Sequence, residues 1–279
     1  MDYKIVVDSC GELTDEMKKS GLYESIALSL LVEDETILDD ESFDQADFLL
    51  KVAGSPESPK SSCPSPDRYM KSYCCDADRI YVVTLSSQLS GSFSSAELGK
   101  KLYEEEYGDK DIYVFNSCSA SIGETLIALK IQECEERRMD FDQVISTVED
   151  YIKEQHTYFV LESLDTLRKN GRLTGIKSFV ASALNIKPVM GSTPAGTIYQ
   201  IGQARGIKRA LAKMVEQVIA EVSNAEGKIL AISHCNCKER ALDVRRMLLD
   251  KLRVKDCIVV ETAGISTMYA NDGGVIVAI

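Results

Sequence analysis

The sequence predicts an α/β protein with two domains: an N-terminal domain with a mostly parallel sheet flanked by helices, and a C-terminal α+β domain with a mixed sheet. In the first half, short runs of β-branched residues alternate with helix-like segments, as in βαβ units. After residue 156 this alternation stops. A short turn at residues 191–196 then joins two strand-like runs, which is typical of an antiparallel hairpin. We therefore expect domains at residues 1–156 and 157–279.

The N-terminal half contains three apolar runs that predict buried strands, Ile5–Val7, Ile80–Val83 and Ile112–Phe115. Each run is followed by Ser, Gly or Cys and then by a helix-like segment. The helices that we expect in this half span residues 14–19, 44–53, 66–74, 92–106, 120–137 and 141–154.

One dense segment, residues 54–66, interrupts this pattern because it is rich in proline and serine. Proline fits neither a helix interior nor a central strand, so we predict a loop here. Composition alone is equally compatible with a solvated linker.

The C-terminal half changes character. Strand-like runs occur near residues 158–161, 186–190, 197–202, 229–232, 258–260 and 275–279. Two longer helices are expected between them, at residues 206–222 and 238–252. No internal repeat is visible.

Composition and charge exclude several classes of protein. The chain has 279 residues and a formal net charge of −12, and an acidic surface repels the phosphates of nucleic acids. It contains no uninterrupted apolar stretch of the roughly 18 residues that a membrane span needs. The first residues do not have the basic-then-apolar layout of a signal peptide. We therefore expect a cytoplasmic protein without membrane insertion, whose nine cysteines are reduced thiols.

Motifs of common cofactor and catalytic sites are absent. The sequence has no Gly-x-Gly-x-x-Gly, no phosphate-binding Gly-x-x-x-x-Gly-Lys-Ser/Thr and no Gly-x-Ser-x-Gly. Its two histidines are His156 and His234. The run from His234 to Cys237 suggests a metal site, but a structural zinc site usually brings a second ligand pair, and none follows. We expect no metal and no cofactor.

Hydroxyl and glycine clusters follow three predicted strands. Asp8-Ser9, Ser86–Ser92 and Asn116–Ser119 each stand where a strand ends. The carboxyl ends of parallel strands line the ligand crevice of an open α/β sheet. Each serine taken singly could also be an ordinary helix cap. Together, the three clusters predict a ligand site at this edge of the sheet.

The chemistry of these clusters indicates a weakly charged anion. Ser90 and Gly91 begin a predicted helix, whose N–H groups and dipole favour negative charge. The clusters contain no lysine or arginine, which phosphate sites usually recruit, so a carboxylate fits better. Arg205, just beyond a predicted strand, is the candidate cation, although it could also be a surface arginine at a helix start.

Five motifs in order resemble those of the DegV family of bacterial fatty-acid-binding proteins. Asp8-Ser9 resembles the family's opening Asp-Ser, and the other four similar segments are Ser61–Pro66, Ser86–Phe93, Leu164–Arg172 and Leu184–Val189. The resemblance runs along nearly the whole chain. It implies a two-domain α/β fold that buries one long-chain fatty acid.

The resemblance also implies that this chain binds the fatty acid and that a separate protein carries out the chemistry. Hydroxyls at Ser61 and Ser90 would contact the fatty-acid carboxylate, with Ser62 and Gly91 beside them and Arg205 near the same mouth. A separate fatty acid kinase would phosphorylate the presented carboxylate. On this interpretation the chain is not an enzyme, and its partners are a long-chain fatty acid and a kinase.

The chain departs from the family near its C-terminus. A family histidine is replaced by Ala270, so we expect Tyr269 or Asn271 to supply the missing hydrogen-bond donor. Two alternative functions stay open. One is a lipid-binding regulator without a kinase partner, and the other is a small-molecule enzyme with Ser90 or Cys118 as nucleophile.

Overall fold

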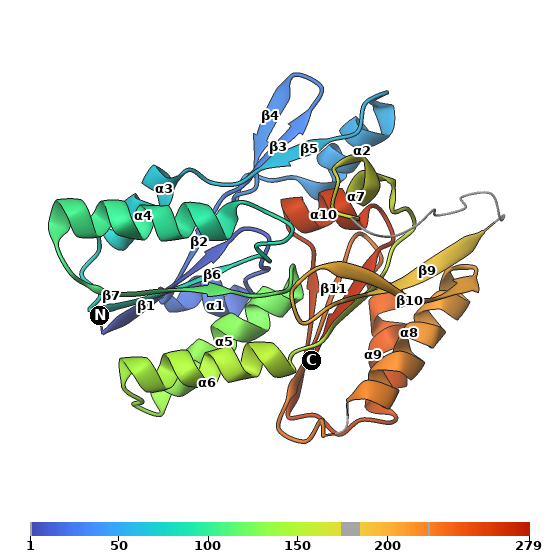
Figure 1. Cartoon of the computed structure of the whole chain (residues 1–279). Coiled ribbons are helices and arrows are strands. Elements are labelled where there is room, and N and C mark those ends of the chain that lie inside the picture. The colour runs from blue at the N-terminus through green and yellow to red at the C-terminus, as the bar shows by residue number, and fades with distance from the viewer. Residues whose placement is uncertain (1, 174–184, 223) are drawn as a thin grey trace.

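Three β-sheets organise the chain, as the computed structural model in Figure 1 shows. The structure describes residues 2–173, 185–222 and 224–279. Four parallel strands from the first half form one sheet, and six strands from the second half form a mixed sheet. These two sheets confirm the predicted fold class. A third sheet of three short strands was not predicted.

The four-stranded sheet has the order β2-β1-β6-β7, and all its neighbours are parallel. Its strands are β1 (Tyr3–Asp8), β2 (Tyr23–Ile26), β6 (Arg79–Thr84) and β7 (Asp111–Asn116). Alternate residues of β1 point to opposite faces. Ile5 and Val7 join one apolar cluster, and Val6 joins another. Both faces are therefore buried, which explains the continuous apolar runs in the sequence.

Helices cover both faces of this sheet. One face packs against α1 (Asp15–Ser20), α5 (Ile122–Glu136) and α6 (Phe141–Glu154). The other packs against α3 (Pro66–Tyr73) and α4 (Ser92–Tyr107). Local capping fixes several starts: the Asp140 and Gln143 side chains form a capping box at α6, and Ser65 caps α3 with Pro66 in its first turn. These helices begin and end within two residues of the predicted positions.

The six-stranded sheet has the order β10-β9-β8-β13-β11-β12, and only β11 and β12 are parallel neighbours. Helices α8 (Ile207–Glu221) and α9 (Lys238–Leu249) cover one of its faces. Its strands are β8 (Thr157–Val160), β9 (Ile186–Ser192), β10 (Ile198–Arg205), β11 (Ile229–His234), β12 (Asp256–Glu261) and β13 (Val275–Ala278). The predicted hairpin is confirmed as the antiparallel pair β9 and β10.

The third sheet corrects the loop prediction for residues 54–66. Strands β3 (Ser29–Val32), β4 (Glu35–Leu38) and β5 (Lys60–Ser62) form it in the order β4-β3-β5, and β5 lies inside the proline-rich segment. Proline is tolerated next to an edge strand, which pairs on one side only. Helix α2 (Gln45–Gly54), whose N-cap is Asp44, lies between β4 and β5 in the chain.

Two short helices were also missed, α7 (Asp165–Lys169) and α10 (Gly264–Ala270). The cap of α10 comes from a distant part of the chain. The Asp39 carboxylate accepts hydrogen bonds from the Gly264 N–H at 2.6 Å and the Ile265 N–H at 2.8 Å. A local sequence window contains no sign of this cap.

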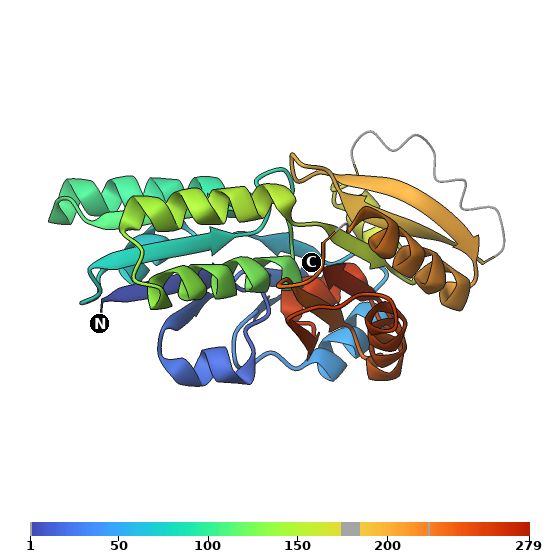
Figure 2. The same cartoon turned by 90° about the horizontal axis from the view of Figure 1, so that it is seen from below.

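The two larger sheets meet through close contacts. In Figure 2, the C-terminus lies between the N-terminal and C-terminal halves. Ile122 and Leu126 of α5 pack against Ala231 and Ala278 of the six-stranded sheet. The tip of the β9–β10 turn also reaches the N-terminal half, where Ser86 donates a hydrogen bond to the Gly196 carbonyl at 2.8 Å. The predicted boundary between residues 156 and 157 stays a prediction about independent folding units.

The turn tip requires glycine at one position. Gly196 has a φ of +83°, and a Cβ there would lie 2.2 Å from the Ser86 Oγ. A side chain would be strained both by the backbone conformation and by the lack of space. Among the helices of the described residues, none combines the length and apolar character of a membrane span.

Candidate functional site

A cavity of about 310 Å³ opens at the carboxyl ends of β1, β6 and β7. The strand order reverses between β1 and β6, because β2 lies on one side of β1 and β6 on the other. Ligands of open α/β sheets bind at such a reversal point. The volume lies within the range of small-molecule sites. The three predicted clusters therefore stand at one edge of the sheet, but only two of them contribute to the cavity lining, since neither Asp8 nor Ser9 lines it.

Most of the cavity wall is apolar. Alternation along β8 turns Tyr158 and Val160 toward α8 and α9, and it turns Phe159 to the cavity. Ile276 of β13, the register partner of Phe159, also lines the cavity. The other large apolar side chains of the lining are Leu28, Leu85, Leu89, Leu161, Leu167, Ile198 and Ile265. This wall suits a flexible hydrocarbon.

Polar groups from three distant segments meet in one part of the cavity. The hydroxyls of Ser61 and Tyr269 lie 3.0 Å apart. The Arg172 guanidinium lies 6.0 Å from the centre of the Tyr269 ring, and it donates a hydrogen bond to the Leu89 carbonyl at 3.0 Å. Among the described lining residues, Arg172 is the only one with a charged side chain. One cation beside several hydroxyls suits a single carboxylate.

The N-terminus of α4 adds to this polar end. Gly91 is its N-cap and has no side chain with which to cap the helix. The Ser90 Oγ accepts a hydrogen bond from the Ser92 N–H at 3.2 Å. A Cβ on Gly91 would lie 3.1 Å from the Cys63 sulfur, so the glycine allows the β5 segment to approach. The helix dipole favours an anion at this position.

The phenol of Tyr269 stays protonated near neutral pH and can therefore donate a hydrogen bond. Burial raises the pKa of Tyr269, while Ser61 and the positive charge of Arg172 act in the opposite direction. The hydroxyl is therefore neutral near pH 7 and can donate a hydrogen bond. Ala270, the next residue in the chain, also lines the cavity.

Several hydroxyls elsewhere in the wall have partners within the protein. Ser119 and Thr157 hydrogen-bond each other at 2.6 Å. Ser121 donates to the Glu12 carboxyl, and Ser266 donates to the Cys10 carbonyl at 3.1 Å. Because these polar groups are already satisfied, this part of the wall does not require a polar ligand atom.

The structure places five of the seven predicted binding residues in the cavity lining, namely Ser61, Ser62, Ser90, Gly91 and Tyr269. Arg205 lies outside the lining, exposed at the end of β10. Asn271 also lies outside it, because it ends α10 and its amide donates to the carbonyls of Ser163 and Tyr269.

Sequence reasoning missed Arg172 as the cation at the cavity. Its only signal was its place at the end of the motif Leu164–Arg172, which carries no information about which side chain faces the cavity. The motif that begins at Leu184 lies partly outside the described residues, since Leu184 is not among them.

The sequence singled out His234 to Cys237 as a weak metal candidate. There the Nδ1 of His234 lies 3.4 Å from a Glu261 carboxylate oxygen, and the Cys237 thiol donates to the Gly274 carbonyl. Within the described part of the chain, the one group of three possible ligands is instead Asp8, Cys10 and Glu124. That group is fully buried.

Comparison with known proteins shows similarity to one protein family along the whole chain. A family model described as an uncharacterised protein of the DegV family matches residues 2–279. A DegV domain-containing protein of Streptococcus gordonii is 32% identical over 279 residues, covering 99% of this chain and 98% of that protein.

Solved structures are similar over the full length as well. A DegV family protein from Ruminococcus gnavus, refined with vaccenic acid, has 63% identity and a TM-score of 0.98, and the match covers 100% of both chains. The Streptococcus pneumoniae Fatty Acid Kinase (Fak) B3 protein, loaded with linoleic acid, has 28% identity and a TM-score of 0.89. That match covers 100% of this chain and 99% of the other.

Proposed function

The chain belongs to the DegV family, and we propose that it binds one long-chain fatty acid in this cavity and presents the carboxyl group to a partner fatty acid kinase. The kinase would then form the acyl phosphate, and the chain itself would supply no catalytic group.

One observation carries the binding proposal: an apolar cavity whose only charged lining residue, among those described, is Arg172 at a cluster of hydroxyls. A fatty acid has the matching chemistry, with one carboxylate on a long hydrocarbon. The vaccenic and linoleic acids in the two similar structures support the same ligand class.

The energetics favour such a ligand. Each buried methylene is worth about 0.8 kcal/mol, so a sixteen-carbon chain gains on the order of ten kcal/mol before association costs. The carboxylate must keep its hydrogen bonds, because an unpaired charged group costs several kcal/mol when buried. Ser61, Tyr269 and Arg172 are placed to supply donors.

Exposure at the polar end supports presentation to a kinase. Ser62, Cys63 and Gly91 line the cavity and are also exposed to solvent. A carboxyl group held there would be accessible from outside while its chain stays buried. The Fak B3 protein among the similar structures supports a kinase partner. A lipid-binding regulator would use the same cavity without that partner.

The enzyme alternative gains no support from the geometry. The Ser90 hydroxyl donates to Ser92 at 3.3 Å, and Ser92 is not a base. Burial raises the pKa of the Cys118 thiol, which is the opposite of what an activated nucleophile needs. The predicted location in the cytoplasm stays a prediction.

Mass spectrometry of an organic extract tests the binding proposal directly. We expect close to one long-chain fatty acid per chain in the extract of the purified protein. Ala120→Phe, which fills part of the cavity, should reduce the bound acid, whereas Ala53→Phe, the same change at an exposed position on α2, should not. An empty extract from protein that also fails to bind added fatty acid would contradict the proposal.

A further inference from the structure

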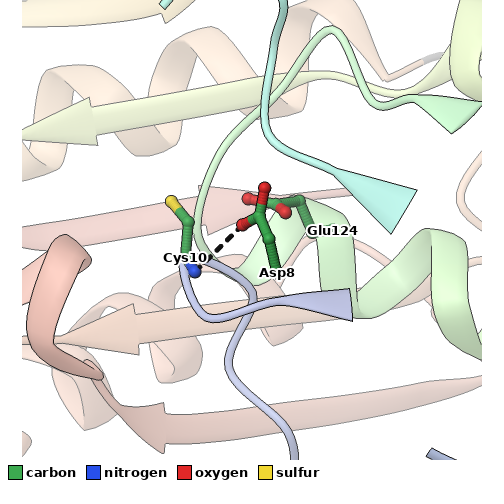
Figure 3. A group of neighbouring side chains, drawn as sticks. All are labelled: Asp8, Cys10 and Glu124. Atoms are coloured by element: carbon green, nitrogen blue, oxygen red, sulfur yellow. Dashed lines mark hydrogen bonds between the residues drawn. The ribbon is translucent and has the colours of Figure 1, made fainter. Parts of the chain in front are cut away.

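A second polar cluster lies beside the cavity, where β1 meets α5. Figure 3 shows the Glu124 carboxyl, from the first turn of α5, next to the Asp8 carboxyl at the end of β1. Ligand-type atoms of Asp8, Cys10 and Glu124 all lie within 4.8 Å of one another. Of the three residues, only Cys10 lines the cavity.

The Asp8 carboxylate is well supplied with hydrogen-bond donors. It accepts from the Cys10 N–H at 3.1 Å and from the Leu85 N–H at 2.9 Å. The Ser92 hydroxyl also acts on it as a side-chain hydrogen-bond partner. Backbone donors stabilise the charged form of a carboxyl group, so Asp8 is the group of the pair that is built to be ionised.

Glu124 has the opposite environment. It is fully buried, and neither of its carboxyl oxygens has a donor within hydrogen-bond distance among the described residues. The Cys10 thiol beside it is a weak donor that lowers its pKa, against the larger effect of burial. Two buried carboxyl groups side by side do not both ionise, because desolvation and repulsion add. A protonated Glu124 resolves both problems, since its O–H becomes a donor and Asp8 is the acceptor beside it.

Among the described residues, no positive charge next to the pair is evident that would offset its negative charge. The titratable groups that face the pair are Cys10 and Glu12, from the segment after β1, and Tyr69 of α3. No basic side chain is among the groups that act most strongly on either carboxyl. Burial raises the pKa of Asp8 to about 6 and raises that of Glu124 well above its usual value, in line with this geometry.

We propose that Glu124 stays protonated and donates a hydrogen bond to Asp8. This pair, acting through Ser92, positions the Ser90 hydroxyl to donate to the carboxylate of the bound fatty acid. This inference rests on the proposed fatty-acid site. It assigns Asp8 and Glu124 as positioning residues, because neither lines the cavity.

Ser92 is the link between the pair and the cavity. It is fully buried, hydrogen bonding from its hydroxyl lowers the pKa of Asp8, and its N–H donates to the Ser90 Oγ at 3.2 Å. Ser90 donates its hydrogen to the Ser92 Oγ at 3.3 Å. When Asp8 holds the Ser92 hydroxyl in place, the Ser90 hydroxyl can turn its hydrogen to the fatty-acid carboxylate. The Ser90 Oγ then still accepts the hydrogen bond from the Ser92 N–H. Ionisation of Glu124 would repel Asp8 and disturb this arrangement.

Infrared spectroscopy tests the protonation state directly. We expect a carbonyl band of protonated carboxyl groups at pH 7 that shifts when glutamate is labelled with carbon-13. Because burial raises the pKa of Glu12 to about 7, the comparison is made in Glu12→Gln protein, where the remaining glutamate band should disappear when Glu124→Gln is added. A Glu12→Gln protein without this band would overturn the proposal. So would stoichiometric zinc that co-purifies with the parent and is lost in Glu124→Ala.

Fatty-acid titrations test the positioning role. Glu124→Gln keeps a donor facing Asp8 and should bind like the parent at pH 7, whereas Glu124→Ala should bind about tenfold more weakly. Glu136→Ala, at an exposed position on the same helix, is the matched control. Above pH 7, affinity should fall in the parent once the pH is high enough to ionise Glu124, and Glu124→Gln should lose less.

The outcomes separate this inference from the function that it rests on. If the parent binds no fatty acid, the proposed function fails, and the infrared band still reports on Glu124. If the parent binds normally and Glu124→Gln is as weak as Glu124→Ala, or the two pH profiles coincide, the positioning role is wrong and the proposed function stands.

Discussion

The hydroxyls of Ser61 and Tyr269 lie 3.0 Å apart although 208 positions separate the two residues in the chain. Ser61 comes from the edge strand β5 and Tyr269 from the helix α10, so two segments that the sequence does not connect form the polar end of the cavity together.

This pair gives a first prediction. Ser61→Ala and Tyr269→Phe should each weaken fatty-acid affinity by about 1–3 kcal/mol, the usual cost of removing a hydrogen bond to a charged group. The double mutant should lose less than the sum, because the two hydroxyls share one network. Isothermal titration with the acid measures this, and the methyl ester of the same acid is the control ligand. Strictly additive losses would show that the hydroxyls act separately.

Arg172 should discriminate between an acid and a neutral lipid. Arg172→Gln should weaken binding of the fatty acid by about 1–3 kcal/mol and leave binding of the alcohol of equal chain length nearly unchanged. The reason is that Arg172 is the one charged side chain among the described lining residues. Arg205→Gln, at an exposed position outside the lining, is the matched control. Equal losses for acid and alcohol would assign Arg172 to wall packing.

Arg205 should matter for the kinase step and not for lipid binding. It is exposed at the end of β10, and no ion pair of the described residues involves it. An exposed guanidinium could contact the kinase or the transferring phosphoryl group. Arg205→Ala should therefore keep its fatty acid and be phosphorylated more slowly, as a coupled assay with a fatty acid kinase would show. Arg209→Ala, a nearby exposed residue, is the control, and equal rates for Arg205→Ala and the parent would contradict this role.

The remote cap of α10 predicts a stability effect. Asp39→Ala removes the acceptor of the Gly264 and Ile265 N–H groups and should cost about 0.5–2 kcal/mol of unfolding free energy. Fatty-acid affinity should fall too, because α10 carries Tyr269. Thermal melts and titrations measure both effects, with Asp40→Ala, the exposed neighbour, as control. An unchanged melting temperature would mean that α10 does not need this cap.

Because Glu12 is a buried carboxyl group with a raised pKa, we expect the stability of the protein to depend on pH. Burial raises the pKa of Glu12 to about 7, above the value of about 4.3 in an unfolded chain. A group with a raised folded-state pKa stabilises the protein below its unfolded pKa, and this contribution is lost as pH rises through the folded pKa. The melting temperature should therefore fall between about pH 4.3 and pH 7.

Glu12→Gln should reduce that fall without abolishing it, since burial also raises the pKa of Asp8 and of Asp39 to about 6. Glu105→Gln, at an exposed position on α4, should melt like the parent across the same range. A melting profile of Glu12→Gln that follows the parent at every pH would show that Glu12 does not carry this effect.

The sequence by itself determined the two larger sheets, apart from the edge strand β2, and the helices around them. Apolar runs such as Ile80–Val83 and the capping pair of Asp140 and Gln143 are local signals, because a strand buried on both faces and a capped helix each need particular residues in a short window. The ordered motifs also indicated the family and five of the residues that line the cavity.

Only the tertiary structure decided which groups meet. The helix α10 is missed in the sequence because its cap, Asp39, lies 225 positions from Gly264. Arg172 ends a sequence motif and Arg205 ends a strand, so the sequence does not distinguish between them as the cation of the site. Only the packing of distant segments brings Arg172 to Tyr269. The protonation of Glu124 was equally hidden, since the pKa of a carboxyl group depends on its burial and on the neighbours that folding brings to it.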